Sequence, residues 1–275
     1  MLFRSRKTGS KKDFTKKFQD SNLAQNKQLS KELYISISQN ARRNPNLCHI
    51  GPYLDFIHFV QSNMLRANMN LLITDIDLFM HSKLKNELYN LGYHLTIVTD
   101  CTQRIFEIFN QSQQAVFVCI KDEEKLRDFY TQWLKEIEDT NNRLSTPLLF
   151  IPGIYIYNVH KNMLRARQYN IHFTFHGEDL DAIQRLYPDY EALLAQCDTV
   201  LVSKVQNANT TQYVNSRIML EIEGLRLKFA NDPNCRMFSS ASSSTKESVQ
   251  EIVRFQDDEC LVLVMANLPV IDKKL

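Results

Sequence analysis

Short, almost wholly apolar runs alternate with longer segments of helical spacing along most of this chain. The runs lie at residues 70–74, 94–99, 115–120, 147–151, 170–175, 199–202 and 260–266, and shorter ones precede them at 33–37 and 47–50. Strands that are apolar on both faces are typical of a parallel sheet covered by helices on both sides. With right-handed crossovers, this alternation predicts an α/β fold, a three-layer α/β/α sandwich around a mostly parallel sheet.

The segments between these runs carry apolar residues at helical spacing. In the clearest case Leu126, Phe129 and Trp133 fall on one helix face, and in another Gly92 stands where a helix C-terminus needs glycine. We predict helices at 54–67, 79–91, 102–111, 123–138, 158–168, 178–195 with a break near Pro188, 208–230 and 247–254. Neither a repeat nor a linker divides residues 31–275, so we expect one domain there, preceded by a basic, poorly ordered segment at 1–30.

Composition excludes several classes of protein. The chain has 275 residues, of which 44% are hydrophobic and 23% charged, as in ordinary globular proteins. Its longest apolar run, 260–266, is far shorter than the roughly 20 residues of a membrane helix, and the start lacks the apolar core of a signal peptide. We therefore expect a cytoplasmic protein without a membrane span. The cysteines show no metal-ligand spacing, and we expect reduced thiols and no metal site at positions 48, 101, 119, 197, 235 and 260.

The first residues differ from the rest in charge, although the formal net charge of the whole chain is only +2. One acid, Asp13, stands among seven cations: Arg4, Arg6, Lys7, Lys11, Lys12, Lys16 and Lys17. Such a cluster can contact DNA or anionic lipid headgroups. It can equally be a solvated tail, and we favour the tail because no aromatic residues interleave usefully with the charges.

Motifs for nucleotide chemistry are missing. A phosphate-binding loop needs closely spaced glycines, a Lys and a Ser or Thr, whereas the glycines here are isolated, at 9, 51, 92, 153, 177 and 224. Asp75 and Asp77 follow a predicted strand, a place where carboxylates can hold magnesium, but a turn with a helix cap explains them better. Arg165 and Arg167 lie on a predicted helix and could contact an anion, although a solvated helix face is the simpler interpretation.

Several segments nevertheless resemble, in order from about residue 28 to the end, the TraG/TraD-type coupling ATPases of conjugative and type IV secretion systems. The segment NARRNPNLCHIG is similar to the lead-in to that family's phosphate loop, and VQSNMLRANMNLLITDIDLF to the stretch after it. TPLLFIPGIYIY occupies the place of the Walker B strand, NIHFTFHGEDL that of the glutamine-bearing strand, and CDTVLVSKVQNANTTQYVN that of the next strand and helix. The resemblance implies a RecA-like P-loop NTPase fold.

The departures from the family fall at its chemistry. The lead-in ends at Gly51-Pro52; Asp55 then falls where the phosphate-loop Lys belongs, and Phe56 where the Ser or Thr belongs. The Walker B acids are replaced by Pro152 and Gly153, and the sensor glutamine is replaced by His176 or a neighbour. In the family an acidic turn follows the strand that corresponds to residues 70–74. Of that turn only Asp75 is kept here, with Asp77 two residues further on. An acid in place of Lys reverses the charge that meets a triphosphate. We therefore expect a pseudo-ATPase whose fold lacks a functional P-loop and which needs no cofactor.

The resemblance also implies partners. A non-catalytic member could dock on a complete coupling ATPase or other conjugation or secretion machinery, at the cytosolic face of the membrane, and the fold would let it enter an oligomer. DNA contact through the basic residues between Arg4 and Lys17 fits the same setting. The family's all-helical insertion is missing, because only residues 101–114 separate the second and third apolar runs of its core, and its membrane helices are missing too.

Two other interpretations remain open. The first two strands of the core, LLIT and HLTIVT, also resemble those of a receiver domain, in which case Cys119 would replace the phosphoacceptor Asp. The match beyond residue 176 favours the coupling-protein interpretation. The chain could also be a decayed gene product without a present function.

Overall fold

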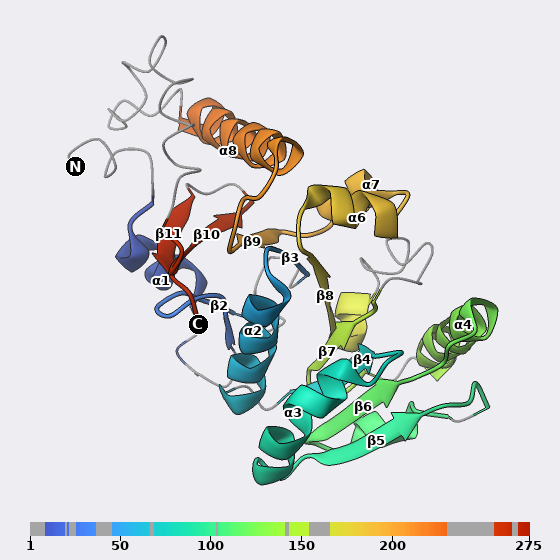
Figure 1. Cartoon of the computed structure of the whole chain (residues 1–275). Coiled ribbons are helices and arrows are strands. Elements are labelled where there is room, and N and C mark those ends of the chain that lie inside the picture. The colour runs from blue at the N-terminus through green and yellow to red at the C-terminus, as the bar shows by residue number, and fades with distance from the viewer. Residues whose placement is uncertain are drawn as a thin grey trace.

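Eleven strands and the helices around them make up the described part of the chain. The computed structural model describes residues 9–19, 21, 26–36, 46–66, 69–102, 104–140, 143–153, 166–229, 256–265 and 269–275; the side chains of 65, 66, 140, 167 and 221–229 lie outside this description. Nine strands form one sheet in the order β11-β10-β9-β3-β8-β7-β4-β6-β5, and β1 pairs with β2 separately (Figure 1). The sheet is the mostly parallel sheet that the apolar runs predicted.

Seven neighbouring strands run parallel: β9 (Thr199–Val202), β3 (Leu47–Ile50), β8 (Ile171–Gly177), β7 (Leu148–Ile151), β4 (Asn70–Thr74), β6 (Gln114–Val118) and β5 (His94–Val98). All residues of β3, β6, β7 and β9 are buried, whereas the edge strand β5 is mainly exposed or half-buried. Burial on both faces explains why these runs contain almost no polar residues.

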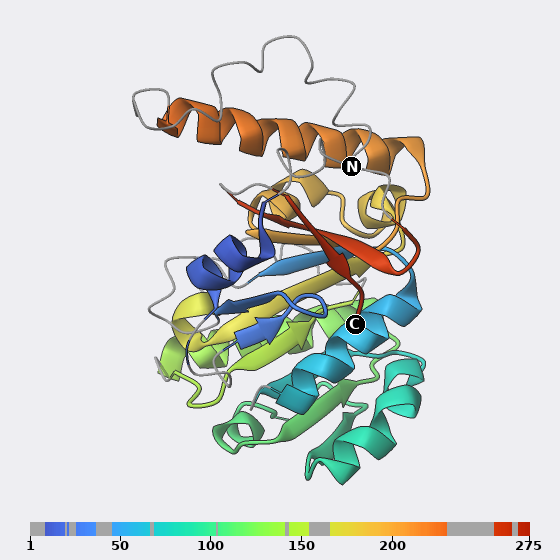
Figure 2. The ribbon, with the colours of Figure 1, turned by 90° about the vertical axis from the view of Figure 1, so that its left-hand side faces the viewer.

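Helices cover both faces of this sheet. On one face pack α2 (Tyr53–Arg66) and α3 (Phe79–Asn90), with Phe56, Val60, Met80 and Leu84 in the interface. On the other pack α4 (Glu123–Thr140), α6 (Leu180–Leu186), α7 (Tyr190–Ala195) and α8 (Ala208–Phe229). Figure 1 shows α3 and α4 on opposite sides of the strands, and Figure 2 shows α8 lying across one end of the molecule. This is the predicted three-layer α/β/α arrangement.

An antiparallel flank completes the sheet beyond β9. It consists of β10 (Glu259–Val264), β11 (Val270–Lys273), the pair β1 (Asn26–Gln28) and β2 (Tyr34–Ser36), and helix α1 (Lys11–Phe18), and we call these elements the flank. Asn63 of α2 holds β1, because its side chain accepts from the Gln28 N–H at 2.8 Å and donates to the Gln28 carbonyl at 2.9 Å. Phe14 and Phe18 of α1 are buried in the core. Part of the segment 1–30, predicted to be poorly ordered, is therefore packed structure.

Several element predictions need correction. The helix predicted at 102–111 is only a 3-10 turn, η3 (Glu107–Asn110), because the chain must cross quickly from β5 to β6. The predicted helix 178–195 is divided at Pro188 into α6 and α7, as its break suggested. β1 and β11 were not predicted. The helix predicted at 158–168 lies outside the described residues except for 166–168, where a second 3-10 turn, η4 (Arg167–Tyr169), precedes β8; the helix predicted at 247–254 lies wholly outside them.

The strand order also excludes the receiver-like alternative. In a receiver the first strand lies between the second and the third. Here the corresponding strands are β4, β5 and β6, and the third, β6, lies between the other two. Within the described residues, none of the helices is both long enough and apolar enough to cross a bilayer.

Candidate functional site

The connection between β3 and α2 is the place where a phosphate loop would lie, and it is only two residues long. β3 ends at Ile50 and α2 begins at Tyr53. Gly51 has φ +147°, its N–H donates to the Gly177 carbonyl at 3.0 Å, and a Cβ there would lie 2.1 Å from Ser203 Oγ. Held between β8 and β9, this turn has a single N–H, that of Gly51, which the Gly177 carbonyl already accepts, since Pro52 has no N–H.

Asp55, at the position of the family's Lys, is already paired. Its Oδ2 lies 2.9 Å from Nζ of Lys274, the penultimate residue of the chain, and both side chains are about four-fifths buried, at 22% and 18% exposed. The pair lies on the side of α2 that faces the flank, where it lines a small gap with Leu201 and Cys260. The acid thus anchors the carboxyl terminus and does not point into the space beside β8.

Aromatic rings occupy the volume above the ends of β3 and β8. Phe56 stacks on His176, with ring centroids 4.5 Å apart and an interplanar angle of 9°. Tyr53 lies 5.2 Å from the same imidazole, and His49 lies 5.5 Å from Phe56. Tyr53 and Phe56 thus fill this place, together with His49 as a further ring.

The two histidines form a pair. Nδ1 of His49 and Nδ1 of His176 are 3.1 Å apart, as expected from their facing positions on β3 and β8. Burial lowers the pKa of His176 to about 4 and, with help from the neighbouring imidazole, holds the pKa of His49 well below its usual range. Both rings are therefore uncharged at neutral pH and supply no cation for an anionic ligand.

Side-chain hydroxyls form hydrogen bonds around the end of β7, which corresponds to the Walker B position. The Thr74 hydroxyl donates to the Pro152 carbonyl at 2.6 Å, and the Tyr130 hydroxyl lies 2.7 Å from the same Thr74 oxygen. The Tyr187 hydroxyl donates to the Gly153 carbonyl at 2.5 Å, where φ is +64°. Three hydroxyls and two backbone carbonyls thus stand where a magnesium-binding acid and a water-positioning acid are needed.

The two acids after β4 have different environments. Asp75 is buried, and its carboxylate accepts from the N–H of Met80 at 3.1 Å and of His81 at 2.7 Å, which is the capping role we favoured. Asp77 is exposed in the following turn. Among the described residues, no three or more His, Cys, Asp or Glu side chains are grouped in a way that could hold a metal ion.

The remaining predicted contact residues lie elsewhere. Arg165 is outside the described residues, as is the side chain of Arg167. Arg4, Arg6 and Lys7 also lie outside them, whereas the four lysines from Lys11 to Lys17 belong to α1. Lys11 is bound to Asp272 at 2.5 Å and to Glu32 at 2.9 Å, and the other three are exposed.

A cavity of about 310 Å³ remains beside these rings, at the carboxyl ends of β4, β7 and β8. Phe56, Gly153 and His176, from three separate sequence segments, share its wall. Residues that sequence reasoning missed contribute as well, notably Thr74, Thr174 and Tyr187. Thr74 ends β4, Thr174 is in the middle of β8 and Tyr187 follows α6, and none belongs to a motif, so only their meeting in space identifies them. We call this space the edge cavity.

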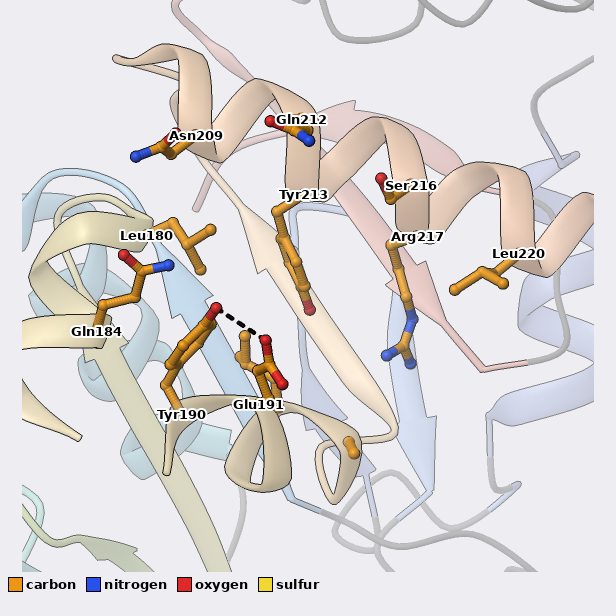
Figure 3. A pocket seen from close by; sticks show the side chains of 12 residues that line it. Leu180, Gln184, Tyr190, Glu191, Asn209, Gln212, Tyr213, Ser216, Arg217 and Leu220 are labelled. Carbon is orange, nitrogen blue, oxygen red and sulfur yellow. Dashed lines mark hydrogen bonds between the residues drawn. The ribbon is translucent and has the colours of Figure 1, made fainter. Parts of the chain in front are cut away.

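A second and larger cavity, of about 510 Å³, lies between α6, α7 and the first half of α8 (Figure 3). Tyr213 and Arg217 extend from α8 toward Tyr190 and Glu191 of α7, and the Tyr190 hydroxyl donates to Glu191 Oε1 at 3.1 Å. Leu220, at its rim, is 69% exposed. This cavity is not connected to any motif in the sequence.

Comparison with solved structures shows the fold. The chain is similar to the bacterial conjugative coupling protein TrwB, in its trigonal TrwBdeltaN70 form in complex with sulphate, with a TM-score of 0.58, 7% identity, and coverage of 98% of this chain and 93% of that one. A second neighbour, the genome packaging NTPase B204 of Sulfolobus turreted icosahedral virus 2 in complex with AMP, has a TM-score of 0.48 and 10% identity, over 84% of this chain and 99% of that one. The fold is that of the RecA-like P-loop NTPases, on the strength of the first of these neighbours. Neither the protein-family models nor the curated proteins include a match to the chain.

Proposed function

We propose that this protein is a non-catalytic relative of the conjugative coupling ATPases, which acts through contacts with macromolecules and does not hydrolyse ATP. The single observation that carries the proposal is the two-residue connection Gly51-Pro52, held between β8 and β9. Binding a triphosphate requires several backbone N–H groups and a Lys aimed at one point. This connection supplies no free N–H and no Lys, and two residues are too few to surround a phosphate.

Charge supports the same proposal. Phosphoryl transfer depends on positive charge and magnesium around the transferred group. Here Asp55 supplies an acid, its partner Lys274 is held on the flank side of α2, and His49 and His176 are uncharged. Bringing a triphosphate to this edge would require desolvating it without compensation, which costs several kcal/mol or more.

Titration with ATP and magnesium, followed by calorimetry and by phosphate release, tests this proposal. We expect no saturable heat, no shift of the melting temperature with nucleotide and no turnover, since a ligand that binds only the native state would raise the melting temperature. The variant Asp55→Lys is the sharpest companion: it puts the residue type of the resembled family at this position and should still not bind ATP, because the connection remains too short and residue 55 faces the flank. Micromolar affinity with turnover in the unchanged protein would end the proposal.

The partner is proposed to be a complete coupling ATPase or another component of a conjugation or secretion machine. The support is the retained RecA-like fold with a packed site, since a fold can serve contacts with other proteins when its nucleotide chemistry is missing. Copurification with a complete coupling ATPase and a change in its ATPase rate are the expected results. A decayed gene product should instead fail to unfold cooperatively when heated.

DNA contact is a second candidate, because α1 presents charge from a packed helix. Phe14 and Phe18 bury one side of α1, which leaves Lys12, Lys16 and Lys17 exposed together. Replacing these three lysines with Gln should weaken DNA binding. It should also make the plot of log affinity against log salt concentration less steep, by about one unit of slope for each phosphate that the protein no longer neutralises. Lys83→Gln with Lys85→Gln, exposed on α3, is the control. Equal binding by both sets of variants would rule out α1 as the DNA-binding element.

A further inference from the structure

The edge cavity lies where α/β sheets usually bind their ligands. β3 and β8 are neighbours in the sheet, and the chain leaves them in opposite directions. From β3 it passes through α2 to β4, beyond β8. From β8 it passes through α6 and α7 to β9, beyond β3. The two sets of helices cover opposite faces, so the chain changes direction here, and the crevice at such a switch point opens at the carboxyl ends of the strands. Tyr53 and Phe56 come from α2, and Ala182 and Leu186 from α6.

Its lining is apolar and aromatic with very little charge. Among its lining residues the only group that is charged at neutral pH is Glu178, which is exposed, since burial lowers the pKa of His176 to about 4. The rest of the wall is made of aliphatic, ring and hydroxyl side chains. No lining residue is a Lys or an Arg. A lining of this kind accepts uncharged molecules and disfavours anions.

Thr174 supplies an independent sign of a ligand. Its side chain is fully buried in the wall of the cavity, and its Oγ1 has no hydrogen-bond partner among the described residues. Leaving a buried hydroxyl unpaired is costly, so native proteins almost always provide a partner for it. A polar atom on a molecule in the cavity is a partner of the right kind, because a hydroxyl can both donate and accept.

We propose that the edge cavity binds a small, neutral, planar aromatic molecule with one hydrogen-bonding atom, in the place where relatives hold phosphates. The stacked rings of Phe56 and His176 and the nearby Tyr53 offer faces and edges that suit an aromatic ring. The volume sets the size: an apolar cavity of roughly 150 Å³ accommodates benzene, so about 310 Å³ suits two fused rings. The inference rests on the proposed function, because a bound nucleotide would need the same edge of the sheet.

Indole is the probe, since it has two fused rings and one N–H. Ligand-observed NMR on the full chain should show binding of indole. Benzothiophene keeps the shape but lacks the N–H and should bind about five-fold more weakly. Indole-2-carboxylate adds a negative charge and should bind at least ten-fold more weakly than indole. Equal binding of the three molecules, or no binding of indole, overturns the inference.

Variants then locate the site. Ala182→Leu places a larger side chain in the cavity and should abolish indole binding, while Leu220→Ala, in the second cavity, should leave it unchanged. Thr174→Val should weaken indole about five-fold and leave benzothiophene unaffected, a pattern that a merely destabilised protein would not give. Insensitivity of indole binding to Ala182→Leu or to Thr174→Val contradicts the assignment.

Magnesium ATP in the same assay separates the two proposals. If neither indole nor ATP binds, the ligand inference fails and the non-catalytic function stands. If ATP displaces indole with micromolar affinity, both fail.

Discussion

At the carboxyl ends of β3, β7 and β8 the side chains that meet are rings, hydroxyls and uncharged imidazoles, whereas in the flank they are ion pairs. The first region is where the sequence resemblance puts a phosphate loop, and Phe56 and His176 are packed there. In the flank, Asp272 binds Lys11, and Lys274 reaches Asp55. The charges close to the site thus hold α1 and the segment after β11 against the sheet, and the centre depends on packing.

This comparison predicts that loss of a ring at the centre costs most. Phe56 is 2% exposed between four rings, so Phe56→Ala should lower the free energy of unfolding by about 3–5 kcal/mol. Phe79→Ala is the control, because Phe79 is 46% exposed and its loss should cost well under half as much. Chemical denaturation measures both. Similar losses for the two variants would show that the centre is not a packed core.

Acid should destabilise the centre next most strongly. The unfolded imidazole titrates near pH 6.5, whereas His176 in the fold takes up its proton only near pH 4. The unfolded state therefore binds more protons between these values, and stability that is complete above pH 6.5 should fall by about 3 kcal/mol by pH 4. His176→Phe keeps a ring against Phe56 and should reduce the slope of this profile in denaturation curves measured across the range, while burial of His49, whose pKa is also lowered, accounts for the slope that remains. An unchanged slope would contradict the role of His176.

In the flank, the loss of Asp272 should cost less. Its side chain is fully buried and accepts from Ser30 Oγ at 2.8 Å and from the Glu32 N–H at 2.7 Å, beside Lys11. Asp272→Asn removes the charge and keeps the shape, and should lower stability by about 2 kcal/mol, because Lys11 is 40% exposed and water can solvate it. A loss of stability as large as that of Phe56→Ala would show that the ion pairs of the flank matter as much as the packed rings of the centre.

The smallest effect is expected at the surface of the flank. Lys273 Nζ lies 2.5 Å from Asp258 Oδ2, but both side chains are largely exposed to water. Such pairs contribute little, because solvent screens them and ordering two long side chains costs entropy. Lys273→Ala should leave the denaturation midpoint unchanged within error. A clear decrease would mean that this pair, too, anchors the terminus.

Much of the fold could be predicted from the alternation of apolar runs, and much of the site could not. The strands at 70–74, 148–151 and 199–202 were found because burial on both faces removes polar residues from them. β1 and β11 were missed, since edge and flank strands carry polar residues such as Lys27 and Asp272 and give no such pattern. A family resemblance identified the positions of Asp55 and Phe56 in the sequence. It did not predict that Asp55 pairs with Lys274 or that Phe56 stacks on His176.

By itself, the sequence determined the layers, the lack of a phosphate-binding motif and the replacement of the Walker B acids by Pro152 and Gly153, because periodicity and residue identity are local properties of a chain. Only the tertiary structure decided that Asp55 is paired with Lys274 and that His49 faces His176. It also decided that the Thr174 hydroxyl, in the wall of the edge cavity, has no hydrogen-bond partner among the described residues. Each of these depends on strands distant in sequence meeting in one register, which no local pattern encodes.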